Sequence, residues 1–195
     1  LTGCLQKTDD DLFFQKAVPV WPEGRQFEMN MTVEFRAEFG KPSTNKAVLN
    51  ITGSSIYRIY LNNEFVGHGP ARAGHGYYRV DEWDLSKHLI DGQNILTVEV
   101  AGYNVNSFYL LDQPSFVQAE IVSGDKVLAA TSPDIDDFGA YQISERVQKV
   151  PRYSFQRPFI EFYRLSSESA KWKNPSPLVR GDTGGYANKR LKGKD

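Results

Sequence analysis

Cysteine is nearly absent from this chain, and long apolar runs and an excess of one charge are missing. Cys4 is the single cysteine among 195 residues, which excludes an internal disulfide and a cysteine-based zinc site. No stretch reaches the length of a transmembrane helix. The chain has 23 basic and 24 acidic residues, a formal charge of −1, so no bulk charge draws it to nucleic acid or to an anionic membrane.

Motifs that carry enzymatic chemistry are also absent. There is no Ser-His-Asp elbow, no glycine-rich phosphate loop and no His-x-x-x-His, and the three histidines lack metal-ligand spacing. Asp81, Glu82 and Asp84 are the densest acidic group, but neighbours on a strand face opposite sides, and acids beside a turn usually cap it or lie in solvent. The sequence therefore predicts no catalytic residue in this chain.

Strand patterns dominate what is present, and no long amphipathic helix or internal repeat accompanies them. Residues 27–37 alternate so that Phe27, Met29, Met31, Val33 and Phe35 share one face, and residues 47–52 and 95–100 are rich in β-formers. Two asparagines at 62–63 favour a left-handed hairpin turn, and Ser123-Gly124-Asp125 favours a second one. Ten Tyr, twelve Phe and three Trp suit the same all-β packing. These patterns predict an all-β sandwich.

Composition divides the chain into three parts. Residues 1–26 are polar and punctuated by proline, which predicts an extended lead-in. Residues 27–165 carry the strand patterns and form the predicted β-sandwich domain, and residues 166–195 have the composition of a linker or connecting segment. The length suits one domain with tails.

The residues around the single cysteine predict export. Leu1-Thr2-Gly3-Cys4 matches the end of a bacterial lipoprotein signal, in which small residues precede a cysteine that is lipidated after cleavage. We therefore expect a periplasmic or outer-surface protein, anchored through lipid on Cys4. A chance occurrence of the four residues is the alternative.

One acidic loop comes close to a calcium-binding motif. Asp134, Asp136, Gly139 and Glu145 stand at positions one, three, six and twelve of a twelve-residue loop, but Phe138 replaces the oxygen ligand needed at position five. A surface loop is the main interpretation, and a Ca²⁺ site is the alternative.

Two loops combine polar and aromatic side chains in the mixture that neutral sugars require, namely rings for stacking and Asn, Arg or His for hydrogen bonds. They cover residues 67–77 and 102–109. The interpretations are packing on an adjoining domain, contact with carbohydrate, or plain surface. The segment 153–159 alternates aromatics with arginine, and Arg157 there predicts a carboxylate or carbonyl partner at an interface. The candidate binding or interdomain residues are Arg72, His75, Tyr77, Tyr103, Asn104, Asn106 and Tyr109.

These motifs carry a family resemblance. The run GHGPARAGHGYYRVDEWDLSKHL, then VAGYNVNSFYLLDQPSF and RYSFQRPFIEFYRL, resembles the N-terminal β-sandwich region of bacterial α-L-rhamnosidases. The resemblance covers roughly residues 27–165 and implies a galactose-binding-domain-like jelly roll. It also implies that catalytic carboxylates lie in a separate helical barrel, for which this chain has no segment.

The resemblance thus implies a non-catalytic accessory domain of a glycoside hydrolase that removes terminal α-L-rhamnose, with the catalytic domain of the same polypeptide and carbohydrate as partners. One alternative is an autonomous carbohydrate-binding or adhesive module. Another is the sugar-binding domain of an enzyme similar to β-galactosidase or β-glucuronidase, which shares the fold and changes the substrate.

Overall fold

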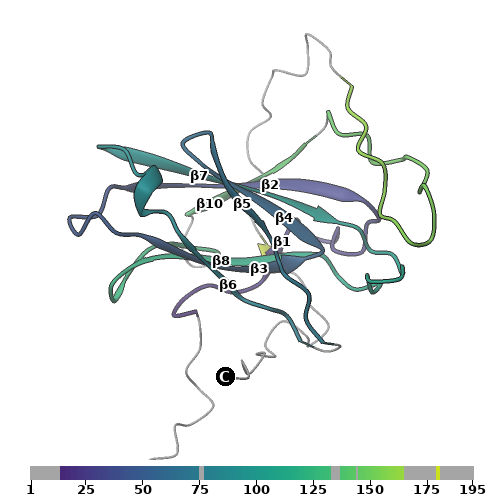
Figure 1. Ribbon diagram of the computed structural model, residues 1–195, viewed down its shortest axis with the longest axis horizontal. Coiled ribbons are helices and arrows are strands. Elements are labelled where there is room, and N and C mark those ends of the chain that lie inside the picture. The colour runs from purple at the N-terminus through teal and green to yellow at the C-terminus, as the bar shows by residue number, and fades with distance from the viewer. Residues whose placement is uncertain (1–13, 75–76, 133–136, 144, 165–178, 181–195) are drawn as a thin grey trace, which may run out of the picture.

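The chain folds into two antiparallel β-sheets that face each other (Figure 1). This computed structural model describes residues 14–74, 77–132, 137–143, 145–164 and 179–180. The only helical element in these ranges is the 3-10 turn η1, Ser86–His88. The predicted all-β sandwich is therefore confirmed. Within the same ranges, no helix is long and apolar enough to cross a membrane.

The first sheet has the strand order β11-β1-β8-β3-β6, with β9 also paired to β8. Two of its strands are short and come from the predicted lead-in and the predicted linker: β1 pairs with β8, and β11 pairs with β1. The bounds are β1 Val20–Trp21, β3 Val48–Ser54, β6 Asp81–Asp84, β8 Phe116–Ser123, β9 Lys126–Ala130 and β11 Val179–Arg180.

The second sheet has the order β10-β2-β7-β4-β5. Its centre is the pairing of β2 with β7, which runs without interruption from Met31 opposite Gly102 to Gly40 opposite Gln93. Alternate residues of both strands enter the core between the sheets, because side chains on a strand alternate between its two faces. The bounds are β2 Met31–Gly40, β4 Ile56–Leu61, β5 Glu64–Gly69, β7 Gln93–Gly102 and β10 Phe138–Gln142.

Both predicted hairpins form. Asn62 and Asn63 have φ of 53° and 67° between β4 and β5, the left-handed geometry that asparagine tolerates. Gly124 has φ of 59° between β8 and β9. These turns agree with the sequence because their local requirement for positive φ selects the residue types found there.

The first predicted strand begins later than its alternation indicated. Met31, Val33 and Phe35 are buried as expected, whereas Phe27 and Met29 are exposed. The backbone turns before the strand, with Glu28 N–H donating to the Arg25 carbonyl and Asn30 at φ of 54°. The alternating pattern therefore extends beyond the residues that pair.

A buried carboxylate fastens the lead-in to the sandwich. Glu120 on β8 is fully buried, and its oxygens accept hydrogen bonds from the backbone N–H groups of Gln15, Lys16 and Ala17 at 2.6–3.1 Å. Successive N–H groups that converge on one anion satisfy its charge without a cation. The neighbouring strand β1 then places Trp21 in the core.

We expect Glu120→Gln to lower the free energy of unfolding by about 2–3 kcal/mol, because an amide accepts these three donors less well than a carboxylate does. Chemical denaturation followed by tryptophan fluorescence measures the change. Glu82→Gln on the exposed face of β6 is the matched control and should lie within about 0.5 kcal/mol of the wild type. Equal losses in the two variants would contradict the anchoring role.

Candidate functional site

The two loops that the sequence singled out meet at one end of the sandwich. The guanidinium of Arg72 lies over the ring of Tyr109, with 5.0 Å from Cζ to the ring centroid. Tyr77, Asn106 and Tyr109 are exposed at this end. The structure thus brings Arg72 and Tyr109 into contact, although the loops are far apart in the sequence.

Tyr103 and Asn104 belong to the same loop but face inward. Tyr103 is buried against Phe159, with ring centroids 6.1 Å apart. Asn104 has φ of 43°, and its side-chain amide donates to the carbonyls of Gln26 and Glu28 at 2.9 and 2.8 Å. These two side chains therefore hold the loop in place and present no surface to a ligand.

A third segment, residues 145–164, completes this end. It folds back on itself, and two isolated antiparallel β-bridges pair the backbone of Arg146 with that of Tyr163 and the backbone of Arg152 with that of Phe159. Arg152 ties it to the second loop by donating to the Asn106 carbonyl at 3.1 Å. We call the surface formed by residues 70–74, 77–79, 103–112 and 145–164 the aromatic end. It lies where β2 begins and β7 ends, on the right of Figure 1.

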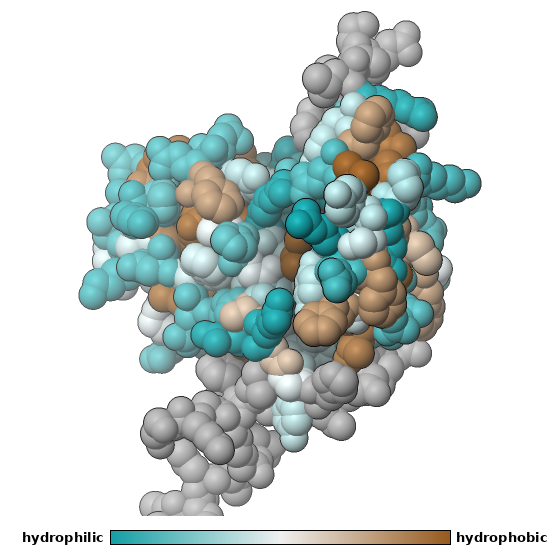
Figure 2. Space-filling view, turned by 45° about the vertical axis from the view of Figure 1, so that its right-hand side comes forward, coloured by the Kyte–Doolittle hydropathy of each residue, from teal (hydrophilic) through white to brown (hydrophobic). Residues whose placement is uncertain are grey.

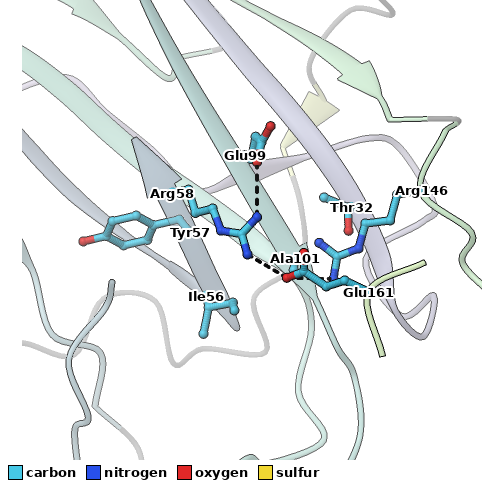
Figure 3. Close-up of a pocket in the computed structure, with 8 residues that line it drawn as sticks. All are labelled: Thr32, Ile56, Tyr57, Arg58, Glu99, Ala101, Arg146 and Glu161. Atoms are coloured by element: carbon cyan, nitrogen blue, oxygen red, sulfur yellow. Dashed lines mark hydrogen bonds and ion pairs between the residues drawn. The ribbon is translucent and has the colours of Figure 1, made fainter. Parts of the chain in front are cut away.

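A cluster of four charges fixes the third segment to the outer face of the second sheet. Arg58 on β4 lies opposite Glu99 on β7 in the strand register, and its guanidinium is 4.0 Å from the Glu99 carboxylate and 2.7 Å from that of Glu161. Arg146 approaches Glu161 from the other side, at 3.9 Å. Figure 3 shows Glu161 between the two arginines and Arg58 between the two glutamates.

The two carboxyl groups of this cluster have different surroundings. Burial raises the pKa of Glu99, Arg58 partly offsets that effect, and Glu34 opposite it on β2 raises the pKa further. Glu161 is at the edge, with its side chain 36% exposed, and it hydrogen bonds to Arg58. The sheet thus holds Glu99 at an electrostatic cost, whereas Glu161 joins the segment to the sheet.

Space around the cluster is too small for a sugar. The cavity lined by Arg58, Glu99, Arg146 and Glu161 has a volume of about 10 Å³, roughly the room of one water molecule. A pair of glycosidase carboxylates needs a sugar ring between them, and here an arginine occupies that position. The cluster is therefore a structural clamp.

Other acidic residues also have local partners. Asp81 accepts hydrogen bonds from the Tyr57 hydroxyl and from Arg79, and Asp84 accepts one from the backbone N–H of Ser86 at the start of η1. Asp84 is exposed, and this contact fits the capping or surface role expected of the acidic group. Burial and the hydrogen bond to Asp81 raise the pKa of Tyr57 above its usual value.

Several predicted residues lie outside the described ranges: His75, Asp134, Asp136 and Cys4. The calcium, histidine and lipid-anchor predictions therefore remain predictions. Glu145, the last residue of the calcium pattern, is described at the base of the third segment. In the part of the chain that is described, no three His, Cys, Asp or Glu side chains gather to hold a metal ion.

Arginines are the site residues that sequence reasoning placed least well. Arg157, for which a carboxylate or carbonyl partner at an interface was predicted, is exposed and lies over the Tyr153 ring at 5.3 Å, so that partner remains a prediction. The buried arginine is Arg146, which carried no distinguishing signal. The Arg58–Glu99 pair depends on β4 lying beside β7, which only the folded chain reveals.

A second, larger hollow lies at the opposite end of the sandwich, where β2 ends and β7 begins. It has a volume of about 610 Å³. Hydroxyl and charged groups line it, and Thr44 and Ser123 join its two walls with their hydroxyl oxygens 2.7 Å apart. The lining of this hollow is mainly polar, whereas the aromatic end exposes many apolar side chains.

Comparison with known proteins connects the fold to one group of enzymes. No family model and no curated protein matches the chain. Among solved structures, the GH78 family rhamnosidase of Bacillus sp. GL1 is similar over 88% of this chain, with a TM-score of 0.71 and 27% identity. The α-L-rhamnosidase of Aspergillus terreus is similar over 69%, with a TM-score of 0.52 and 20% identity.

This chain spans only 18% and 17% of those two enzymes. A lectin from Pleurotus ostreatus is more distant, with a TM-score of 0.46, 15% identity and coverage of 87% of this chain and 43% of the lectin. The predicted resemblance to a β-sandwich region of α-L-rhamnosidases is confirmed. Fold and comparison together define a β-sandwich domain that is similar to a region of α-L-rhamnosidases.

Neutralising the two carboxylates of the clamp should change the free energy of unfolding in opposite directions. Glu161→Gln weakens the link between segment and sheet, so we expect a loss of about 0.5–1 kcal/mol in unfolding free energy at pH 7. Glu99→Gln should instead stabilise the fold at pH 7. Because folding raises the pKa of Glu99, this carboxyl lowers the free energy of unfolding as the pH rises from its usual pKa of 4.5 through its pKa in the folded protein, and glutamine removes that cost.

Urea denaturation at pH 4 and pH 7 measures both effects. The gain from Glu99→Gln should shrink toward pH 4, where the carboxyl of the wild type is largely protonated in the folded state. A loss of equal size in both variants at pH 7 would contradict the different roles assigned to the two groups.

Asn104→Ala should destabilise the fold by about 2–3 kcal/mol, because it removes three hydrogen bonds, to Gln26, Glu28 and Ser115, and places alanine at a positive φ. Thermal unfolding measures the loss. Asn106→Ala in the same loop is the matched control, because Asn106 is exposed and its side chain accepts only the Asp112 N–H. A wild-type melting temperature in Asn104→Ala would contradict the structural role of this side chain.

Proposed function

We propose that this chain is a non-catalytic β-sandwich module of a glycoside hydrolase that resembles α-L-rhamnosidases. The observation that carries the proposal is the likeness to the Bacillus sp. GL1 rhamnosidase: 88% of this chain is matched at 27% identity and a TM-score of 0.71, yet the match covers only 18% of the enzyme. A region that is a minor part of a large hydrolase is suited to support other domains.

The chemistry of the described residues supports an accessory role. The carboxylates of the clamp are separated by Arg58 around a cavity of about 10 Å³, which leaves no room for a glycosidic bond. Asp81 and Asp84 are engaged with side-chain and backbone donors of their own strand region. The residues that carry out hydrolysis would belong to another domain of the same polypeptide.

Hydrolysis of 4-nitrophenyl α-L-rhamnoside tests this proposal. We expect turnover by the full-length product of the gene and none by the 195-residue chain alone. The matching β-galactoside and β-glucuronide are the control substrates and should be hydrolysed much more slowly. Turnover by the 195-residue chain, or a full-length product that prefers a control substrate, would contradict the proposal.

Titration of the 195-residue chain with L-rhamnose and rhamnosylated oligosaccharides tests the alternative of an autonomous binding module. An accessory module should show no saturable heat. Saturable binding that is lost in Arg72→Ala or Tyr109→Ala, and retained in a variant at the opposite end such as Lys126→Ala, would support the alternative instead.

A further inference from the structure

Exposed apolar side chains are concentrated at the aromatic end. Of the fourteen large hydrophobic residues exposed in the described ranges, nine belong to this surface. Figure 2, which brings this side of the molecule forward, shows brown side chains gathered among teal ones. Soluble domains seldom leave an apolar area of this kind open without a partner. The nine are Tyr77, Phe108, Tyr109, Leu111, Tyr153, Phe155, Ile160, Phe162 and Tyr163.

Two further exposed residues border the same surface. Phe27 and Met29 are 64% and 52% exposed, and their segment is held here because Asn104 and Gln148 donate to the carbonyls around them. The aromatic end is therefore one broad area at a single end of the sandwich.

Arginine side chains run through this area on aromatic supports. Arg72 lies over Tyr109, Arg152 over Phe155 and Arg157 over Tyr153, at 5.0–5.6 Å from the ring centroids. Arg152 also donates to the carbonyls of Asn106 and Phe155, so it links the loop that carries Tyr109 to the third segment. Stacking keeps each guanidinium in place, and the exposed guanidinium groups of Arg72 and Arg157 can still donate to an acceptor.

The charge of the aromatic end is positive although the whole chain is nearly neutral. The surface contains six arginines and one lysine against three carboxylates, whereas the chain as a whole has a formal charge of −1. Two of the six arginines are paired with carboxylates: Arg79 with Asp81, and Arg146 with Glu161 of the clamp. Arg72 and Arg157 are exposed toward solvent.

This composition is typical of the centre of a protein–protein interface. Such centres are enriched in Tyr, Phe and Arg and depleted in Lys, Asp and Glu, and aromatic and arginine side chains carry much of the binding energy. A site for a small ligand is instead concave, and the 610 Å³ hollow of this molecule lies at the opposite end. The observations therefore favour a protein surface over a free sugar.

We propose that the aromatic end docks onto another folded domain of the same polypeptide, whose contact face has an apolar centre and a rim of carboxylates that meet Arg72 and Arg157. The inference rests on the proposed function, since it requires the additional domains that make up most of the rhamnosidase of Bacillus sp. GL1. The opposite, polar end remains open to solvent in this arrangement.

Hydrogen exchange on the full-length gene product and on the 195-residue chain alone tests the docking. Backbone amides of residues 106–112 and 152–163 should exchange at least tenfold more slowly in the full-length protein. Amides of residues 41–46, at the opposite end, should exchange equally in both. Equal exchange at the aromatic end would overturn the inference.

A charge-reversal pair refines the test within the full-length protein. Arg72→Glu with Arg157→Glu should restore the fast exchange of the isolated chain. Lys46→Glu with Lys126→Glu makes the same change in charge at the opposite end and should leave the protection unchanged. Both charge-reversal pairs should retain the fold, because all four side chains are exposed. Loss of protection in both pairs of variants, or in neither, would overturn the inference that carboxylates of the partner domain meet Arg72 and Arg157.

Two further readouts separate the possible failures. Hydrolysis of the rhamnoside by a full-length protein whose aromatic end exchanges freely would overturn the docking and leave the proposed function standing. Protection without α-L-rhamnoside hydrolysis would support the docking and remove the proposed function. Saturable binding of polygalacturonate by the 195-residue chain, lost in the Arg72→Glu and Arg157→Glu pair, would assign the surface to an acidic glycan instead.

Discussion

The ten-residue pairing of β2 with β7 is the constraint on which the rest of the structure depends. It places Val33 and Phe35 opposite Val100 and Val98 on the core side. A slip of one residue would turn this whole apolar row to the outside, so the register is strongly specified. The same pairing determines the two ends of the sandwich, since the loops that follow β7 and precede β2 must emerge together.

Asparagines secure the chain where these strands end. Asn94 is fully buried, and its side chain bonds to the backbone N–H and carbonyl of Ile90, which closes the turn before β7. At the other end of β7, the side chain of Asn104 likewise holds the segment before β2, by donating to the carbonyls of Gln26 and Glu28. Because an asparagine side chain both donates and accepts, it satisfies loop backbone that no neighbouring strand reaches. The exposed aromatic side chains are thus carried on well-fastened loops.

Local patterns in the sequence predicted the sandwich, the two hairpins and the chief strands, because alternation and turn chemistry depend on neighbours in the chain. They also located the two loops that meet through Arg72 and Tyr109. They did not show that Tyr103 faces inward, since its burial depends on Phe159, more than fifty residues further along. The clamp was equally hidden: Arg58 and Glu161 become neighbours only after residues 145–164 fold back over the sheet.

The fastening of the lead-in to Glu120 also has a consequence for the order of folding. The three N–H donors stand 103–105 positions before their acceptor in the chain. During synthesis, residues 15–17 therefore leave the ribosome long before β8 exists, and contacts of such separation form late because the intervening loop must first be closed. The carboxylate of Glu120 is desolvated only at that stage. Residues 15–17 are thus among the last parts of the sandwich to take their place.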